Sequence, residues 1–509
     1  MDIENIRFSD ALEKTDNTTD DVDLGKKLQT NFSEMLVYKS SANSKFFSAL
    51  SLPSFMRDWL VMRFSDSRGK IDKEDVSNYI KRTIPNKEQW NGYLVDLLHN
   101  NQSVRFLTKI KIDFDTSTRT ALFSLPDFGV PKKKGEAIAD WSVIEESREY
   151  LLSPTEVWGI IEIICEQADN ESDNYFRLID FTPFCPYTID LDYYVQARNN
   201  FSINEWIDVL LSAIDYNPKG YISIKQKLTM LSRLIPFVEK RVNLIELAPK
   251  ETGKSYLFAQ ISKYGWLVSG GSISRAKMFY DISKKTPGLV SRYDYVAFDE
   301  IQSIKFTDAL EMQGALKGYL ESGEYRVGDS RGVGDAGLVL LGNIDTELMN
   351  INQNMFVDLP ELFHESALLD RFHGFIKGWD IPKMKESLKA NGWALNTEYF
   401  GEIMHMLRGE LSYRAAVDEL LDLPKNSATR DTEAIKRICT AFLKLLFPNF
   451  TDVQTVNIND FEIYCLEPAK EMRRVIKTQL GIIDYGEFGG STIPDIKIKE
   501  KYREENKDL

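Results

Sequence analysis

The sequence predicts an α/β protein with a nucleotide-binding core, and three segments support this prediction. The apolar run 242–247 leads into a loop that ends with Gly253–Ser255, and helix-forming residues follow. A second apolar run ends in Asp299–Glu300, and a third ends in Asn343. A strand, a glycine-containing loop and a helix in this order are typical of a phosphate-binding loop, because the helix N-terminus and backbone N–H groups attract anions.

The phosphate loop combines three residue types that each suit nucleotide binding. Gly253 lets the backbone approach a phosphate, Lys254 pairs with the β- and γ-phosphates, and the Ser255 hydroxyl binds Mg²⁺. The usual G-x-x-x-x-G-K-[ST] pattern is broken at its first position, where Ala248 replaces glycine and removes conformational freedom. We expect ATP and Mg²⁺ as ligands. The expected ATP-binding residues are Ala248, Pro249, Lys250, Glu251, Thr252, Gly253, Lys254, Ser255 and Tyr256.

The second half of the expected site lies about 45 residues further on. In ATPases with such a loop, a carboxylate at the strand tip, here Asp299, holds Mg²⁺ through water, and the next carboxylate, here Glu300, polarises the attacking water. The alternative is a buried strand that ends in solvated acids, but this spacing after a phosphate loop favours nucleotide chemistry. Ser255 and Asp299 are therefore the expected metal residues.

Composition limits the class of protein. The 509 residues exceed one compact core, and 43% hydrophobic with 28% charged residues is typical of a globular chain. The net charge of −14 argues against an overall basic nucleic-acid binder but leaves room for a local basic surface. Four cysteines and four histidines, widely spaced, provide no metal-binding cluster. With no signal peptide or membrane span in the sequence, we expect a soluble cytoplasmic protein.

The chain before the core is expected to form a separate domain. Residues 1–24 are polar and acidic and predict a loose arm, and residues 25–195 predict a mixed α/β domain that could bind DNA. Within it, the stretch 52–64 predicts an amphipathic helix, 104–114 predicts a half-buried strand, and 154–167 predicts a helix. The core then spans 196–385, a helical lid 386–475 and a tail 476–509.

Basic residues in and after the core have two interpretations each. Arg275 and Lys277 follow a glycine-rich turn after a strand and are either channel-facing or in an ordinary loop. Arg326 and Arg331 lie in a glycine-rich stretch that predicts a flexible hairpin. Arg371 and Arg430, on later segments, would most often be salt-bridge residues, but their order after Asn343 makes them candidates for contact with a neighbouring nucleotide. The DNA-binding candidates are Arg275, Lys277, Arg326 and Arg331.

This order of features resembles AAA+ ATPases of the MCM-helicase and Lon-like branch. More closely, the chain resembles the Lon-related BrxL family of BREX phage-defence systems. The resemblance covers residues 28–482 and is most specific in the ATPase core. It rests on Leu52–Phe64, Val242–Ser255, Val296–Glu300, Ala367–Arg371, Gly378–Met384 and Tyr464–Arg474.

The resemblance implies a fold, an assembly and a set of roles. The fold is an AAA+ P-loop NTPase core with a helical lid. The implied protein is a DNA-binding ring ATPase, a hexamer or double hexamer that restricts phage together with other phage-defence proteins. In this family type, Asn343 is the sensor that orients the attacking water, and Arg371 is an arginine finger from a neighbouring subunit. The implied catalytic residues are Glu300, Asn343, Arg371 and Arg430.

Two features depart from the family, and two other functions stay open. Longer members carry a protease-like domain, whereas this sequence ends about 35 residues after Arg474, so we expect no peptide hydrolysis. Ala248 puts affinity or rate in question. Besides a motor or clamp on duplex DNA, the chain could be an ATP-dependent protein remodeller or a scaffold that uses ATP only to assemble. The small polar loop 270–272 favours DNA over protein remodelling, which usually needs an apolar pore residue.

Overall fold

The computed structural model divides the chain into two compact units. The first unit combines Met1–Met62 with Ile189–Leu509, and the second comprises Arg63–Thr188. The structure describes residues 21–48, 52–66, 70–133, 135–153, 156–167, 174–184, 187, 189–283, 285–425, 427–450, 453 and 457–505. This division differs from the predicted one, because the segment before residue 63 belongs with the core.

A five-stranded parallel sheet forms the centre of the first unit. Its order is β17-β7-β16-β12-β8, and each neighbouring pair is parallel. The three central strands consist almost entirely of buried residues, as expected for strands covered on both faces. The strands are β7 (Leu244–Ala248), β8 (Gly265–Ser269), β12 (Tyr295–Asp299), β16 (Gly337–Asn343) and β17 (Gly374–Lys377).

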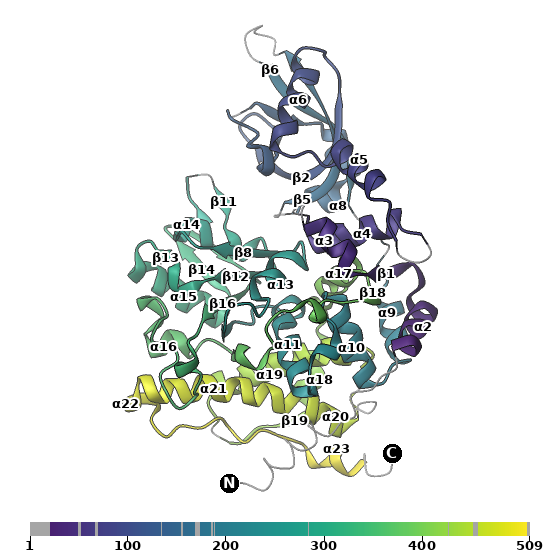
Figure 1. The fold of residues 1–509 in the computed structure, drawn as a ribbon. Helices are drawn as coiled ribbons and strands as arrows, with labels where there is room; N and C mark the ends of the chain where they lie inside the picture. Colours follow the sequence, from purple (N-terminus) through teal and green to yellow (C-terminus); the bar gives the residue numbers. More distant parts are fainter. Residues whose placement is uncertain are drawn as a thin grey trace. The chain divides into compact units, whose positions relative to one another are not determined.

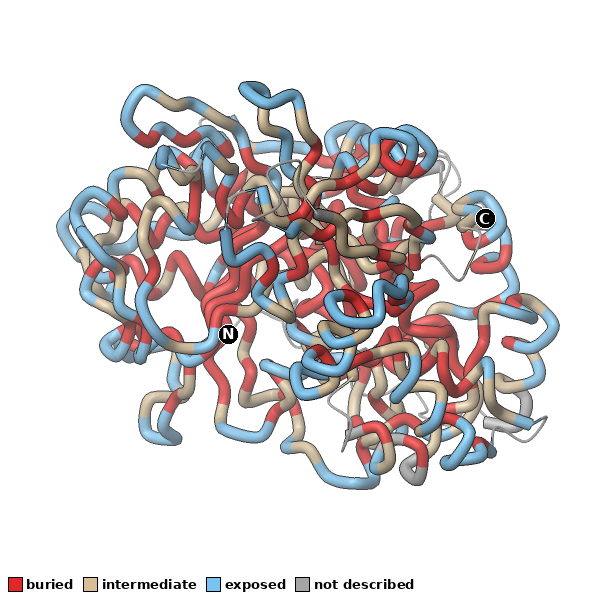
Figure 2. Tube along the Cα trace, turned by 90° about the horizontal axis from the view of Figure 1, so that it is seen from above, coloured by how far each residue is buried: buried red, intermediate tan, exposed pale blue. Residues whose placement is uncertain are grey.

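Helices before and between these strands cover the sheet. Ser202 caps α10 with a reciprocal bond from Glu205, as the sequence predicts. Pro236 lies in the first turn of α12, and a short turn at 232–234 separates this helix from α11. Figure 2 shows buried residues in the interior and exposed residues along the outer loops. The helices are α9 (Leu191–Arg198), α10 (Ile203–Ala213), α11 (Ile224–Leu231), α12 (Ile235–Val238), α13 (Lys254–Gln260), α14 (Arg275–Met278), α15 (Ala309–Ser322) and α16 (Ser366–Leu369).

Short strand pairs project from the core between its main strands. A hairpin of β14 (Glu324–Val327) and β15 (Ser330–Val333) precedes β16, as predicted for the glycine-rich stretch. A smaller hairpin joins β10 (Tyr280–Asp281) to β11 (Thr286–Pro287). β9 (Ser272–Ile273) pairs in parallel with β13 (Lys305–Phe306).

The C-terminal part of the first unit is mainly helical. Helix α21 packs against β17 and lies beside α19 along one side of the unit (Figure 1). The predicted tail is structured where the structure describes it, because α21 extends to Ile483 and β20 (Lys497–Ile498) pairs with β19 (Leu421–Asp422). The helices are α17 (Thr397–Leu407), α18 (Ser412–Leu420), α19 (Thr429–Leu446), α20 (Ile458–Phe461), α21 (Glu467–Ile483), α22 (Tyr485–Phe488) and α23 (Glu500–Glu505).

The N-terminal segment is built into this unit. β1 (Leu36–Lys39) pairs antiparallel with β18 (Gly392–Leu395), far along the chain. It is flanked by α2 (Asp21–Phe32), α3 (Ser41–Ser48) and α4 (Ser54–Phe64). The loose arm was predicted to extend to residue 24, but residues 21–24 belong to α2. Residues 1–20 lie outside the part of the chain that the structure describes.

The second unit contains a closed five-stranded barrel. Its order is β2-β3-β4-β6-β5, in which only the pair β4–β6 is parallel. Helices α7 (Trp141–Glu146) and α8 (Arg148–Leu151) connect the third strand to the fourth. This topology is that of the OB-fold, a five-stranded Greek-key barrel. The other elements are α5 (Lys73–Thr83), α6 (Lys87–Leu98), β2 (Val104–Asp115), β3 (Thr120–Ser124), β4 (Ala137–Ala139), β5 (Val157–Gln167) and β6 (Asn174–Pro183).

The barrel corrects one prediction. Residues 157–167 form strand β5 rather than a helix, and this strand pairs with both β2 and β6. Its run of isoleucines and valine favours a strand, because β-branched side chains pack well on a pleated surface.

The structure also describes the hydrophobicity of the helices and the state of three cysteines. Among the described residues, no helix is long and apolar enough to cross a membrane. Cys439 and Cys465 are buried free thiols, and Cys165 is partly buried.

Candidate nucleotide-binding site

The predicted phosphate loop connects β7 to the N-terminus of α13. Gly253 caps the helix with a φ of 78°, and a Cβ built there would lie 2.2 Å from the Tyr216 hydroxyl oxygen. Only glycine fits this position, both for its backbone angle and for its space. Ala248 lies earlier, inside β7, where the backbone is extended. Since φ is not positive there, the missing glycine causes no backbone strain.

Lys254 is a buried cation that contacts uncharged oxygen atoms. Only 7% of it is exposed, and its Nζ lies 3.2 Å from Asn343 Oδ1 and 3.4 Å from the carbonyl oxygens of Ala248 and Pro249. It forms no ion pair with a carboxylate in the part of the chain that the structure describes. Burial lowers the pKa of Lys254, and nearby carboxylates, chiefly Glu246, oppose this shift. A buried ammonium group of this kind is stabilised when an anion binds beside it.

The sheet order brings the other predicted residues to the same edge. Asn343 lies directly opposite Ala248 in the β16–β7 register, and Asp299 ends the adjacent strand β12. Glu300 follows with a φ of 49°, an uncommon angle for a residue with a side chain, and its N–H donates to Asp299 Oδ1 at 3.0 Å. Such angles persist only where the surrounding structure holds them, and they cluster at active sites and ligand-binding loops.

These residues line one cavity of about 420 Å³. It lies at the carboxyl ends of parallel strands, where α/β proteins bind ligands. Ser255 and Asp299 offer the hard oxygen ligands that Mg²⁺ accepts together with water. Among the described residues, no group of three or more His, Cys, Asp or Glu side chains is placed to hold a metal ion, so a metal here would need substrate and water ligands. The lining residues are Lys250, Glu251, Thr252, Gly253, Lys254, Ser255, Tyr256, Asp299, Glu300 and Asn343.

A buried ion pair beneath the loop was not predicted. Arg233 and Glu246 are fully buried and form two bonds, from Nε at 3.0 Å and from an Nη at 2.6 Å. Arg233 also donates to the carbonyl oxygen of Thr252 at 2.9 Å, so the pair holds the loop from below. The signal for it was Glu246, a carboxylate in the middle of an apolar strand, because buried charges require a partner.

The structure does not bring Arg371 and Arg430 to this cavity. Both contact Glu321 on α15, Arg371 through Nε at 2.8 Å and Arg430 through an Nη at 3.1 Å. Neither lines the cavity described above. Arg473, fully buried, binds Asp370 and the carbonyl oxygen of Phe372 and so fixes the backbone on both sides of Arg371.

The four basic DNA-binding candidates divide into two pairs. Arg326 and Arg331 are exposed and lie directly opposite each other on β14 and β15. Within the described ranges, neither guanidinium forms an ion pair or a hydrogen bond. Arg275 pairs with Glu311, and Lys277 is exposed on α14.

The comparisons with known proteins agree on one family. A family model described as "Lon-like protease BrxL-like, ATPase domain" matches residues 176–493, and one described as "BREX system Lon protease-like protein BrxL N-terminal" matches residues 30–164. The chain is 27% identical over 486 residues to a protein named "Lon-like protease BrxL" from Escherichia coli O9:H4 (strain HS). A protein of the same name from Bacillus cereus (strain H3081.97) is 30% identical over 350 residues. The matches cover 94% and 68% of this chain but 68% and 51% of these relatives.

Proposed function

The chain belongs to the BrxL family of BREX-system Lon-like proteins, and from this premise we propose that it hydrolyses ATP to clamp or move along DNA in phage defence. The ATPase activity follows from the family's ATPase domain, which spans 176–493. DNA binding, ring assembly, a cytoplasmic location and cooperation with other phage-defence proteins are parts of the proposal. The absence of peptide hydrolysis remains a prediction, since the relatives carry the name of a protease.

The observation that carries the proposal is the buried Lys254 ammonium group, which faces a polar cavity and has no carboxylate partner among the residues that the structure describes. A triphosphate would supply the missing negative charge, and the N-terminus of α13 would add its partial positive charge. Gly253 lets the loop pass close to the Tyr216 hydroxyl, where a side chain would clash, and so allows the backbone angle of the loop.

The residues at the strand ends would bind the metal ion and position the attacking water. Ser255 and Asp299 would hold Mg²⁺, which neutralises charge on the phosphates when it is bound. Glu300 would polarise the attacking water, and Asn343 would orient it from the neighbouring strand. Asn343 already contacts Lys254, so one polar chain links the phosphate-binding and water-positioning groups.

The arrangement is proposed to be that of an AAA+ ATPase whose site is completed by a neighbouring subunit. The strand order β17-β7-β16-β12-β8, with the phosphate loop after β7 and Asp299 at the end of β12, supports this proposal. The positions of Arg371 and Arg430 support it as well. Both side chains contact Glu321, and neither lines the nucleotide cavity of its own subunit. An arginine that acts in trans requires a ring, and a hexamer or double hexamer satisfies this requirement.

DNA is proposed as the partner because of the β14–β15 hairpin and the barrel. Arg326 and Arg331 face each other across the hairpin, and like charges in opposed positions are unfavourable without an anion between them. A phosphate backbone is such an anion. The second unit has the topology of a fold that binds oligonucleotides. Duplex DNA without sequence preference is the proposed ligand, since these contacts address the backbone.

The experiment that tests the proposal is ATP turnover with and without duplex DNA, in the wild type and in Glu300→Gln. We expect turnover that DNA stimulates and that the substitution abolishes. Glu347→Gln, at an exposed carboxylate outside the cavity, is the matched control and should behave as the wild type. Turnover indifferent to DNA but lost in Glu300→Gln would favour a protein remodeller, and no turnover at all would favour a scaffold assembled by ATP.

A further inference from the structure

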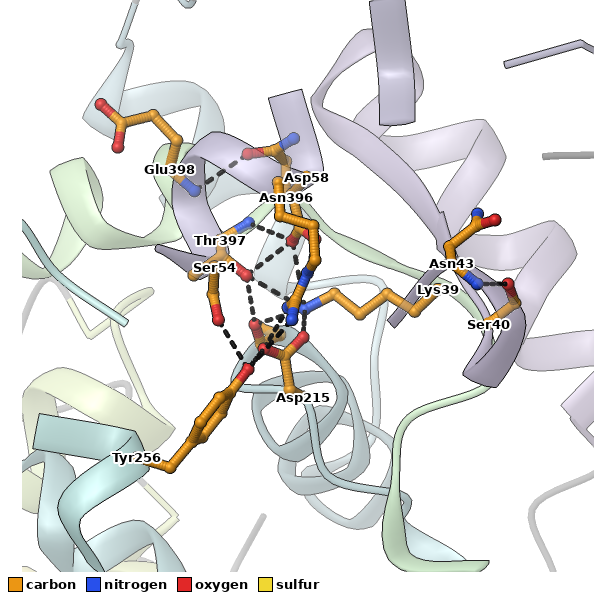
Figure 3. A network of polar contacts seen from close by, with 12 residues as sticks. Lys39, Ser40, Asn43, Ser54, Asp58, Asp215, Tyr256, Asn396, Thr397 and Glu398 are labelled. Atoms are coloured by element: carbon orange, nitrogen blue, oxygen red, sulfur yellow. Dashed lines mark hydrogen bonds and ion pairs between the residues drawn. The ribbon is translucent and has the colours of Figure 1, made fainter. Parts of the chain in front are cut away.

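A polar network joins the phosphate-loop helix to the N-terminal segment of the chain. Its members come from β1, α4, the loop after α10, the first turn of α13 and the start of α17 (Figure 3). In sequence they lie in both matched family regions, since residues 30–62 fall in the N-terminal family model yet belong to the first compact unit. The N-terminal family region therefore contributes to the same unit as the nucleotide cavity.

The Tyr256 hydroxyl is the point where the network meets the phosphate loop. It lies 2.6 Å from Asp215 Oδ2, 2.6 Å from Ser54 Oγ and 3.2 Å from an Arg57 Nη. Because a carboxylate only accepts, Tyr256 donates to Asp215, and its oxygen accepts from Ser54 and Arg57. All the hydrogen-bonding capacity of this hydroxyl is thus used by residues outside the loop, two of them on α4.

Asp215 is the centre of the network. Its Oδ1 accepts from Lys39 at 2.7 Å, and its Oδ2 accepts from Arg57 at 2.5 Å as well as from Tyr256. Burial alone would raise the pKa of Asp215, but Arg57 and Lys39 lower it well below its usual range. The carboxylate is therefore ionised, and it shares its charge between a lysine on β1 and an arginine on α4.

Lys39 anchors the other side of the network rigidly. Its Nζ donates to Asp215, to the carbonyl oxygen of Ala213 at 2.8 Å and to Thr397 Oγ1 at 3.1 Å. Asp58 of α4 lies 3.3 Å away and balances the second positive charge. Two cations and two carboxylates thus form a neutral, buried group, in which each charge depends on the others.

Arg57 borders open space, as Lys39 does, but it is the cation of the network that contacts Tyr256. A cavity of about 300 Å³ is lined by Arg57, Asp215, Gly253 and Tyr256 together with residues of β1 and of the segment 384–390. Gly253 and Tyr256 also line the phosphate cavity, so the two spaces meet at the loop. The guanidinium group therefore has room to change its position when charge at the loop changes.

We propose that Arg57 and Asp215 are positioning residues that couple nucleotide binding at the loop to the docking of α4. This inference rests on the proposed binding of ATP by Lys254 and Ser255. A bound triphosphate brings negative charge to the turn of α13 that carries Tyr256, and the attraction to Arg57 then holds α4 more firmly. By reciprocity, a docked α4 favours nucleotide binding by the same factor.

Helix α4 connects the nucleotide site to the barrel unit along the chain. The helix begins at Ser54 beside Tyr256 and ends at Phe64, while the barrel unit begins at Arg63. The chain therefore enters the barrel through the helix that the nucleotide site holds. A change in α4 docking is a change at the covalent entry of the proposed DNA-binding unit.

Hydrogen–deuterium exchange of the full-length protein tests the coupling. The amides of residues 54–64 are followed with and without a non-hydrolysable ATP analogue and Mg²⁺, and nucleotide binding is measured in parallel with a fluorescent analogue. In the wild type we expect the nucleotide to slow exchange in α4 at least several-fold. In Arg57→Gln we expect nucleotide binding within a few-fold of the wild type, but no change of exchange in α4.

Matched variants separate coupling from folding. Arg63→Gln removes the same charge from the same helix, where it lies against the rings of Phe64 and Tyr79 rather than against Tyr256, and should keep the wild-type response. Arg57→Lys keeps the charge and should restore part of the response. If Arg57→Gln does not fold, Ser54→Ala replaces it, because this change removes only the hydroxyl that donates to Tyr256.

The outcomes distinguish this inference from the proposed function. Nucleotide binding with unchanged exchange in wild-type α4, or an equal response in Arg57→Gln and the wild type, would overturn the coupling alone. Failure of the wild type to bind nucleotide would overturn the proposed function and the coupling with it. Lys254→Ala removes the phosphate-binding ammonium group, so the nucleotide should not change hydrogen exchange in α4 of this variant. It serves as the negative control.

Discussion

The pair Arg233–Glu246 shows how single residues hold the phosphate loop in place. Both side chains are fully buried, and Arg233 reaches from Glu246 to the carbonyl oxygen of Thr252. A buried pair adds little stability over an apolar pair, but removing one partner leaves an uncompensated charge. The pair is therefore better explained as a support for the loop, whose Thr252 carbonyl oxygen accepts a hydrogen bond from Arg233.

Glu246→Gln tests this support. We expect a loss of about 3 kcal/mol of unfolding free energy, because Arg233 keeps its charge and loses its carboxylate, and a raised KM for ATP because the loop loses its anchor. Chemical unfolding and steady-state turnover measure the two effects. Asp208→Asn is the control: it breaks the buried pair with Lys227 at 2.6 Å, away from the loop. A loss of stability with unchanged KM in both variants would show that the pair is only structural.

His373 is a second buried group with a measurable consequence. Its ring accepts a bond at Nδ1 from the Asn243 N–H at 3.0 Å, and burial, with Arg437 and Arg473 nearby, lowers the pKa of His373 to about 3. The unfolded chain takes up this proton near pH 6.5, so the folded state is favoured fully above that pH and loses stability as the pH falls toward 3.

The prediction is that His373→Gln removes part of the acid sensitivity. Between pH 7.5 and pH 5, we expect His373 to lower the free energy of unfolding by about 2 kcal/mol. This free energy falls by about 1.4 kcal/mol for each pH unit below the pKa of the unfolded histidine. Urea unfolding of both proteins at the two pH values measures this difference. An equal loss between pH 7.5 and 5 in the wild type and the variant would contradict the assignment.

Some residue-level features could be read from the sequence and others could not. Gly253, Lys254, Asp299 and Asn343 follow a known order of strand ends, and a parallel sheet brings such ends together. The contact of Arg57 with Asp215 links positions 158 residues apart, and no local pattern encodes it. Such pairs depend on the tertiary fold alone.

At the scale of elements, periodicity identified the buried strands and the well-capped helices. β7, β12 and β16 were predicted within two residues, because parallel strands buried on both faces are continuous apolar runs. Residues 157–167 were predicted wrongly as a helix, since periodicity alone does not distinguish a buried strand from a buried helix, and the β-branched residues that favour a strand were given too little weight. β1 was not predicted, because its partner β18 is remote in sequence.

The β14–β15 hairpin is an element with a specific expected effect on DNA binding. Tyr325 and Val327 are buried, so the alternate side chains, including Arg326, face outward opposite Arg331. Replacing both arginines by alanine removes two phosphate contacts. We expect the slope of log affinity against log salt to become shallower by about 2, at about 0.9 per phosphate.

Fluorescence anisotropy on a labelled duplex at several salt concentrations measures this slope. The control is Arg474→Ala with Lys497→Ala, which removes the same charge from the C-terminal region, where each cation pairs with an adjacent carboxylate. An unchanged slope in the hairpin variant would place the DNA contact elsewhere in the protein.

At the scale of the whole molecule, the position of Arg371 predicts that activity requires assembly. Arg371 contacts Glu321 and lies outside the cavity that holds Lys254, so the two can act on one nucleotide only if they come from different copies. The finer division into domains was the least predictable property. The N-terminal segment joins the core through pairings such as Leu36 with Leu395, which composition cannot reveal.

Mixing two inactive variants tests the shared site. Arg371→Ala should lower turnover by about 10³–10⁵, as for other arginine fingers, while still binding ATP. Lys254→Ala should abolish ATP binding. In a one-to-one mixture, about one quarter of the interfaces carry both intact residues, so turnover should recover to about that fraction of the wild type. A mixture as inactive as its components would contradict a site shared between copies.

The pairing of β1 with β18 also has a consequence for the synthesis of the chain. β1 leaves the ribosome well before β18. At a synthesis rate of about 5–20 residues per second, it stays unpaired for on the order of half a minute. The barrel unit, made of contiguous residues 63–188, is completed during this interval. The nascent chain therefore carries an unpaired strand and an undocked α4 beside a finished barrel, and translation speed between them sets how long those apolar surfaces remain open to aggregation.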